Sequence, residues 1–395
     1  MNDVAARTIL PSGVGQVVSA EDARLVHGLY SGRLMPARQF EAFARLATIF
    51  PVRAVSRGEA APVQSPRDAT GMPEMRFASR GEACDLYDYV SRNRVVGLEI
   101  RKGGTVRLEY FDRGLDADSR RTSMSMAKSV TSLLVGCAIA QGHIGGLDDQ
   151  LALYLPRLAG SAYEGVSVRQ LLLMASGVQW REDYADPASD RRRMLELQIA
   201  QQPGAIMDYM AELHRVGAPG SLWNYSTGET HVAGALVAAA TGHSLADYLS
   251  DRIWSRLGMD ADAAWWLEAP GGLEVAGSGL FATLRDFGRL GQFVAGGGVV
   301  AGEPVLPSDW AALSGSCAIV APGRGHYGLM WWPIPDDRGR YVDGAFRAGG
   351  IFGQYIYVNP AQDVVVTVWS QRSKALGAEA IEDNDFFNAV VEALR

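Results

Sequence analysis

The positions of its strand-forming segments constrain the fold of this 395-residue chain more than any other feature. Val95–Arg101 and Thr105–Phe111, joined by Lys102-Gly-Gly, predict a β-hairpin. Two more strands are expected at residues 354–358 and 363–369, near the other end of the chain. Between about residues 160 and 255 the apolar periodicity is helical instead. We therefore expect an α+β fold, in which an antiparallel sheet built from both ends of the chain is flanked by helices and carries an inserted all-helical domain.

This pattern predicts three regions along the chain. Residues 1–80 form an N-terminal extension or arm, residues 81–155 and 256–395 the α/β domain, and residues 156–255 the helical domain. The first region has one amphipathic helix at Ala37–Ile49, and it is either wrapped over the main domain or joins two copies into a homodimer. Gly277–Asp286 is expected to open a helix that ends at Gly296. Clefts between two such lobes are common ligand sites.

An apolar run at residues 125–140 contains a single cation, Lys128. Only three of the 37 cationic side chains are lysines, so this chain rarely uses lysine for charge alone. A buried lysine can lose its proton, whereas an arginine cannot. Residues three apart share a helix face, and a helix N-terminus favours developing negative charge. Ser125 and Lys128 are thus predicted to be a nucleophile and its base. The alternative is a helix-capping serine followed by a lysine that extends to the surface.

Tyr225 opens a small polar turn directly before an apolar helix. If it faces Ser125, its phenol can serve as a general base or proton relay. The ordinary pKa of tyrosine, about 10, is too high for that role, so a nearby ammonium such as Lys128 would have to lower it. The alternative is a capped helix start with a half-buried tyrosine.

Glycines lead into a predicted strand at Arg347–Gln354. Glycine lets a backbone approach a ligand closely, and an N–H group at this strand edge can join that of Ser125 in an oxyanion hole. The alternative is a β-bulge or a tight turn.

Together these three motifs resemble the serine beta-lactamase and penicillin-recognising family. Ser125-Met-Ala-Lys128 resembles its Ser-x-x-Lys motif, and Tyr225-Ser-Thr227 its Tyr-x-Asn motif with threonine in place of asparagine. The likeness covers about residues 85–395 and is greatest to the branch of 6-aminohexanoate-dimer hydrolases and carboxylesterases. It implies a beta-lactamase/transpeptidase-like fold and a serine hydrolase that cleaves linear amide or ester bonds through an acyl-enzyme, without a cofactor.

The same resemblance implies four further substrate-binding or oxyanion residues. The segment Glu182–Ser189 is similar to a loop whose tyrosine contacts the scissile amide, which gives that role to Tyr184. The N–H group of Ile351 is implied as the second oxyanion donor, beside Gly350, and Trp331 as a substrate contact.

One departure separates this chain from the beta-lactamases themselves. They carry Lys-Thr-Gly on the strand, where this chain has Ala348-Gly-Gly350 with no aligned cation. Arg347 substitutes for that lysine only if its side chain points the same way. Ester or linear-amide hydrolysis is therefore favoured over beta-lactam hydrolysis. The rival functions are a carboxylesterase, an acyltransferase or a weak beta-lactamase using the same residues, and a non-enzymatic penicillin-binding-type sensor, which slow deacylation would reveal.

Charge and cysteine content restrict the partners and the compartment. The net charge is −7 and no basic run is long, so a small-molecule amide or ester is the expected partner rather than nucleic acid or a membrane. The N-terminus lacks a basic start followed by an apolar core, and we expect no secretory signal. Cys84, Cys137 and Cys317 are odd in number and far apart, which indicates reduced thiols in a cytoplasmic protein. Neither they nor the six histidines have metal-ligand spacing, so no metal site is expected.

Overall fold

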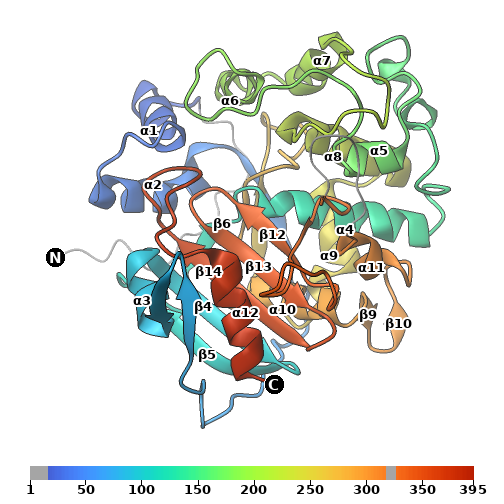
Figure 1. Ribbon diagram of the computed structural model, residues 1–395. Coiled ribbons are helices and arrows are strands. Elements are labelled where there is room, and N and C mark those ends of the chain that lie inside the picture. The colour runs from blue at the N-terminus through green and yellow to red at the C-terminus, as the bar shows by residue number, and fades with distance from the viewer. Residues whose placement is uncertain (1–16, 317–325) are drawn as a thin grey trace.

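A six-stranded antiparallel sheet, in the order β11-β12-β13-β14-β4-β5, forms the centre of the protein (Figure 1). The computed structural model describes residues 17–316 and 326–395. It confirms that both ends of the chain contribute to this sheet. Its strands are β4 (Val95–Lys102), β5 (Thr105–Phe111), β11 (Trp332–Pro333), β12 (Phe346–Gly350), β13 (Gln354–Asn359) and β14 (Val364–Ser370).

The central strands β13 and β14 are buried along their whole length. Helix α10 (Leu284–Ala295) packs against β13, β14 and β4. Apolar residues of α12 (Asp383–Ala393) join a separate cluster with other residues of the same strands. Because both faces are covered, these strands are continuous apolar runs without the alternation of a half-exposed strand.

A second, four-stranded antiparallel sheet has the order β1-β7-β8-β6. Its strands are β1 (Val52–Val55), β6 (Arg120–Thr122), β7 (Ala263–Trp266) and β8 (Leu280–Thr283). The prediction that Gly277–Asp286 opens a helix is therefore wrong in part. Residues 280–283 pair as β8, and α10 begins only at Leu284, where the Thr283 side chain accepts a hydrogen bond from the N–H of Asp286.

The described part of the N-terminal region packs on the main body. It contains α1 (Ala20–Tyr30) and α2 (Pro36–Ile49), whose apolar faces belong to the main hydrophobic cluster. Strand β1 pairs with β7, and Gln39 Nε2 donates to the carbonyl of Arg372 at 2.8 Å. Residues 17–80 thus lie against this chain, and the homodimer stays a prediction. Short elements complete this part of the fold: β2 (Arg76–Ser79), β3 (Glu82–Asp85) and α3 (Leu86–Arg92).

Residues 156–255, all of which the structure describes, contain helices and no strand beyond isolated bridges such as Val178–Arg215. They are α5 (Val168–Leu172), α6 (Asp190–Ala200), α7 (Ala205–Glu212), α8 (Thr227–Thr241) and α9 (Leu245–Arg252). Helices α5–α8 gather at one side of the molecule, at the top of Figure 1, whereas α9 lies below α4 (Met126–Ala140) in this view and packs against β1. Beyond α10 lie β9 (Val299–Val300), β10 (Glu303–Pro304) and α11 (Trp310–Ser314).

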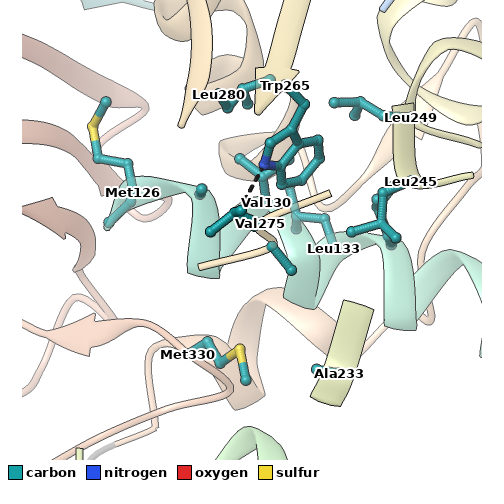
Figure 2. Packing of buried hydrophobic residues seen from close by; sticks show 14 of the residues in the cluster. Met126, Val130, Leu133, Ala233, Leu245, Leu249, Trp265, Val275, Leu280 and Met330 are labelled. Carbon is teal, nitrogen blue, oxygen red and sulfur yellow. Dashed lines mark hydrogen bonds between the residues drawn. The ribbon is translucent and has the colours of Figure 1, made fainter. Parts of the chain in front are cut away.

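Helix α4 (Met126–Ala140) runs between this helical block and the sheets (Figure 1). Figure 2 shows its Val130 and Leu133 surrounded by side chains from the helical block and from β7 and β8. All its residues from Met126 to Ala138 are buried, so apolar packing on every side fixes the helix. A functional group at its first turn is consequently held in place by the core of the protein.

Within residues 17–316 and 326–395, no helix is long and apolar enough to cross a membrane. Cys84 and Cys137 are buried free thiols, and Cys137 lies in α4 as expected of a core residue. Cys317 falls outside the described residues.

Candidate active site

Ser125 stands at the N-terminus of α4, in a turn that the neighbouring sheet holds. The preceding residue, Met124, has φ of +45°, a left-handed conformation that is costly for a side chain other than glycine. The N–H of Ser123 donates to the carbonyl of Leu280 in β8 at 2.7 Å, which ties the turn to the second sheet. The Ser125 hydroxyl makes no capping hydrogen bond with the helix, so it remains available for chemistry.

The amine of Lys128 contacts three oxygen atoms. Its Nζ atom lies 2.9 Å from Ser125 Oγ, 2.9 Å from Thr227 Oγ1 and 3.1 Å from the carbonyl oxygen of Gly277. The side chain is 1% exposed. The alternative in which Ser125 caps the helix and Lys128 extends to solvent is therefore wrong.

Burial lowers the pKa of Lys128 to about 7, against 10.5 for an exposed lysine. The negative charge of Glu182 opposes this shift, and the positive charge of Arg191 adds to it. A substantial fraction of the amine is therefore neutral near neutral pH and able to accept a proton.

Tyr225 precedes α8 and faces the same serine. Its hydroxyl is hydrogen-bonded with Ser125, and the Lys128 Nζ atom lies 5.1 Å from the centre of its ring. The predicted lowering of its pKa is wrong. Burial, reinforced by the charge of Glu182, raises the pKa of Tyr225 well above that of a free tyrosine. Tyr225 is therefore a neutral phenol when substrate arrives, and the group that titrates near neutrality is the lysine.

The end of β12 lies beside the turn that carries Ser125. Ile351 follows the strand directly and lines the same cavity, and the next residue, Phe352, has φ of +65°. A Cβ atom on Gly350 would lie 2.6 Å from the carbonyl oxygen of Ser123, so only glycine lets the strand approach this closely. Gly350 thus serves a close approach between β12 and the turn before α4.

A cavity of about 740 Å³ opens beside Ser125. Tyr184, Gly350 and Ile351 line it, and their roles in binding or oxyanion stabilisation stay predictions. Four aromatic side chains also line it, those of Trp180, Trp223, Tyr225 and Trp332.

Trp331 is not in the cavity wall. It is 1% exposed and packs edge-on against Phe346 with 5.1 Å between ring centres. Its neighbour Trp332 takes the predicted place, because successive side chains of an extended segment point to opposite sides.

Arg347 lines the cavity, although Ala348 beside it is fully buried. Its guanidinium lies 4.6 Å from the centre of the Tyr355 ring and 3.9 Å from the carboxylate of Asp383, at the start of α12. Its guanidinium is thus directed toward Tyr355 and the start of α12.

Glu182 and Thr227 complete the site, and the sequence reasoning did not assign either a role. Thr227 Oγ1 lies 2.5 Å from Glu182 Oε1, and the N–H of Thr227 donates to Glu182 Oε2 at 2.9 Å. The two residues are 45 positions apart, so no local spacing reveals the contact. Threonine in place of the asparagine of the resembled motif was the one available signal.

Comparison with known proteins places this geometry in a family. The model of the Beta-lactamase family matches residues 92–385, a span that contains Ser125, Lys128 and Tyr225. Over 345 residues the chain is 30% identical to 6-aminohexanoate-dimer hydrolase from Paenarthrobacter ureafaciens, covering 82% of this chain and 83% of that protein.

Solved structures share the fold. A Bacillus anthracis chain provisionally assigned as a 6-aminohexanoate-dimer hydrolase superposes with a TM-score of 0.73 at 23% identity, over 91% of this chain and 92% of that chain. A class C beta-lactamase gives a TM-score of 0.58 at 18% identity, over 78% and 93% of the two chains. A family VIII carboxylesterase gives a TM-score of 0.58 at 16% identity, over 76% of this chain and 92% of that chain. The expected family and fold class are confirmed, and the chain belongs to the beta-lactamase family.

Proposed function

We propose that the protein is a serine hydrolase that cleaves linear amide or ester bonds through an acyl-enzyme at Ser125. The observation that carries the proposal is the 2.9 Å contact between Lys128 Nζ and Ser125 Oγ, made by a buried amine whose pKa burial lowers to about 7. A serine hydroxyl needs an adjacent base to become a nucleophile, and this amine is placed to be that base. The relationship to 6-aminohexanoate-dimer hydrolase supports a linear amide as the substrate class.

Acylation begins with transfer of the Ser125 proton to the neutral amine of Lys128. As the proton leaves, Oγ attacks the substrate carbonyl carbon, and a tetrahedral intermediate with a negatively charged oxygen forms. The N–H groups of Ser125 and Ile351 are proposed to hold that oxygen. Preorganised donors of this kind are among the largest contributors to acyl-transfer catalysis.

Expulsion of the leaving group requires a proton on its nitrogen or oxygen. Tyr225 is a neutral phenol beside Ser125 and is proposed to donate that proton as the bond to the acyl carbon breaks. The resulting phenolate recovers a proton from the ammonium of Lys128. Lysine thus accepts the first proton and tyrosine delivers one to the leaving group, so Lys128 alone acts as the base.

Tyr184 is proposed to contact the leaving nitrogen. Its hydroxyl donates to Glu182 Oε1 at 3.0 Å, since a carboxylate can only accept. The tyrosine oxygen then retains its acceptor capacity on the cavity side, where a substrate amide N–H can donate to it. In the second half of the reaction, water gives a proton to Lys128 and its oxygen attacks the acyl-enzyme carbonyl. As the bond between the acyl carbon and Ser125 Oγ breaks, Oγ takes that proton back from the Lys128 ammonium.

We propose the cytoplasm as the compartment of the enzyme. The unpaired buried thiols of Cys84 and Cys137 support a reducing environment.

The proposal is tested by parallel hydrolysis of a linear 6-aminohexanoate dimer and a short-chain p-nitrophenyl ester, with Ser125→Ala as the control. Turnover of either substrate that disappears in the control supports the proposal. Amide turnover assigns the enzyme to linear-amide hydrolysis, and ester turnover alone makes it a carboxylesterase. Turnover of neither, or turnover that persists in the control, contradicts the proposal.

A further inference from the structure

The carboxylate of Glu182 is enclosed by hydrogen-bond donors. Its Oε2 atom accepts from the indole Nε1 of Trp180 at 2.5 Å and from the backbone N–H of Thr227 at 2.9 Å. Its Oε1 atom lies 2.5 Å from the hydroxyl of Thr227 and 3.0 Å from that of Tyr184. The indole and backbone groups have no acceptor capacity, and the side chain is 9% exposed. This environment suits the ionised carboxylate, which accepts at all four contacts.

The ionised carboxylate fixes the direction of the Thr227 hydroxyl. Because a carboxylate has no hydrogen to give, the threonine must donate to Glu182. The Thr227 oxygen then presents only lone pairs to Lys128 Nζ, 2.9 Å away on its other side. Glu182 thus determines that this contact is a donation from lysine to threonine.

The orientation of the Lys128 amine follows from its three contacts. The carbonyl of Gly277, at 3.1 Å, can also only accept, so two hydrogens of the amine are directed to Thr227 and Gly277. The one remaining contact is Ser125 Oγ, at 2.9 Å. When the amine is neutral, its lone pair therefore faces the hydroxyl that it has to deprotonate.

Other charged or titratable groups surround this chain of contacts. Arg191 of α6 lies 4.0 Å from Glu182 Oε1, and its Nη2 donates to the hydroxyl of Tyr30 in α1 at 2.8 Å. Tyr184 and Tyr225 face the carboxylate from the loops before α6 and α8. Glu182 is the anion whose charge favours the ammonium of Lys128, and Arg191 opposes it.

We infer that Glu182 is a positioning residue that acts through Thr227 to aim the lone pair of Lys128 at Ser125. The inference rests on the proposed function, because it assigns Lys128 as the base of that reaction. In this arrangement the hydroxyl of Thr227 donates to Glu182, and the neutral amine of Lys128 donates one hydrogen to Thr227 and one to Gly277. The hydroxyl of Ser125 donates to the lone pair of Lys128. Attack by Ser125 moves only this last hydrogen.

Replacement of Glu182 by glutamine should reverse the direction of the hydrogen bond between this side chain and the Thr227 hydroxyl. The glutamine oxygen is required at the position that accepts from Trp180 and the Thr227 N–H. Its NH2 group then faces the Thr227 hydroxyl and donates to it. The threonine hydrogen is displaced toward Lys128, where it competes with Ser125 for the amine lone pair.

The test measures the rate at which a fluorophosphonate labels Ser125 as a function of pH, in the wild type and in Glu182→Gln, Thr227→Val and Thr227→Ser. Valine keeps the shape of threonine without its hydroxyl, and serine keeps the hydroxyl. Glu196→Gln is the charge-matched control, because Glu196 does not line the cavity and its Oε1 atom lies 2.8 Å from His27 Nε2. This probe reports on the serine and its base whatever the natural substrate is.

In Glu182→Gln we expect the pH at half-maximal labelling rate to fall by about one unit, because the ammonium loses a nearby anion. In Thr227→Val it should also fall, because the ammonium loses an acceptor. The plateau rate should fall about tenfold or more in both variants, as the base loses its alignment. Thr227→Ser and Glu196→Gln should resemble the wild type.

A merely structural role for Glu182 would reduce the labelled fraction without moving the midpoint. An unchanged midpoint and plateau in Thr227→Val overturns the inference, even if Glu182→Gln does not fold. If the wild type is labelled at Ser125 and the variants have the same midpoint and plateau rate as the wild type, the proposed function stands and only this inference is refuted. Absence of labelling at Ser125 in the wild type removes both.

Discussion

Lys128 and Ser125 are one helical turn apart, and 2.9 Å separates the lysine Nζ from the serine Oγ. The lysine reaches this position inside a helix that is buried on all sides, where an ammonium is poorly solvated. The same packing that holds the two groups in contact also lowers the pKa of the amine to about 7. Geometry and basicity therefore have a single physical origin, the burial of the first turns of α4.

Lys128→Arg should lower the kcat/KM of ester hydrolysis by about 10²- to 10⁴-fold, the usual contribution of a general base. Arginine keeps the charge but cannot become neutral in a protein. Lys102→Arg is the matched control, because Lys102 lies at the β4–β5 turn and donates to the carbonyl of Gln362. A Lys128→Arg enzyme of near-normal rate would exclude the lysine as the base.

Tyr225→Phe should damage amide hydrolysis more than hydrolysis of a p-nitrophenyl ester. Nitrophenolate leaves without a proton, whereas an amide nitrogen needs one, which Tyr225 supplies in the proposed mechanism. We expect a loss of about 10²-fold or more for the amide and less than about tenfold for the ester. Tyr327→Phe serves as the control, because Tyr327 is buried in the same aromatic group but does not line the cavity. Equal losses on both substrates would contradict the role as acid.

Gly350→Ala should displace the end of β12 from the turn before α4. The added Cβ atom would lie 2.6 Å from the carbonyl oxygen of Ser123, which is backbone and cannot rotate away. The Ile351 N–H would move with the strand, and loss of one oxyanion donor costs about 10²- to 10³-fold in kcat. Kinetics of the folded variant test this, with Gly146→Ala as the control, since nothing lies within 4 Å of a Cβ atom there. An unchanged kcat would place the oxyanion hole elsewhere.

Glu229→Gln should change how stability depends on pH. Burial raises the pKa of Glu229 to about 8, against 4.5 for an exposed glutamate, and Ser176 donates a hydrogen bond to it. Between these two values the folded state binds more protons than the unfolded state, so this residue lowers wild-type stability as pH rises through that window. Glutamine does not titrate, so the difference in free energy of unfolding between the variant and the wild type should change with pH. From about pH 5 to about pH 9 it should shift in favour of the variant by on the order of a few kcal/mol. Urea denaturation at both pH values provides the measurement, and parallel pH profiles would refute the raised pKa.

The sequence was most informative where the chemistry is local. Ser125 and Lys128 form one helical turn, so their contact follows from spacing and from the scarcity of lysine. The strands β4, β5, β13 and β14 were predicted because they are long and contain β-branched and aromatic residues.

The rest of the site depends on contacts between distant segments. The carbonyl of Gly277 that accepts from Lys128 is 149 positions away, and a backbone acceptor leaves no signature in side-chain type. The Glu182–Thr227 contact and the raised pKa of Tyr225 likewise follow from tertiary packing. The choice between Trp331 and Trp332 depended on strand register, because a shift of one residue reverses the side.

At the level of the fold, short strands were the main elements that the sequence did not predict. The second sheet consists of strands of three or four residues, too short for a distinct alternation, and β8 runs directly into α10. The apolar residues of that junction fit a helix as well as a strand.

The central claim is tested most directly by mass spectrometry of the protein after reaction with a fluorophosphonate from about pH 5 to about pH 9. We expect one adduct, on the peptide that contains Ser125, absent from Ser125→Ala, and formed at half its maximal rate near pH 7, where Lys128 loses its proton. Stoichiometric labelling of Ser125→Ala, an adduct on a different residue, or a labelling rate that does not vary across this range would contradict the assignment of Ser125 as nucleophile and Lys128 as its base.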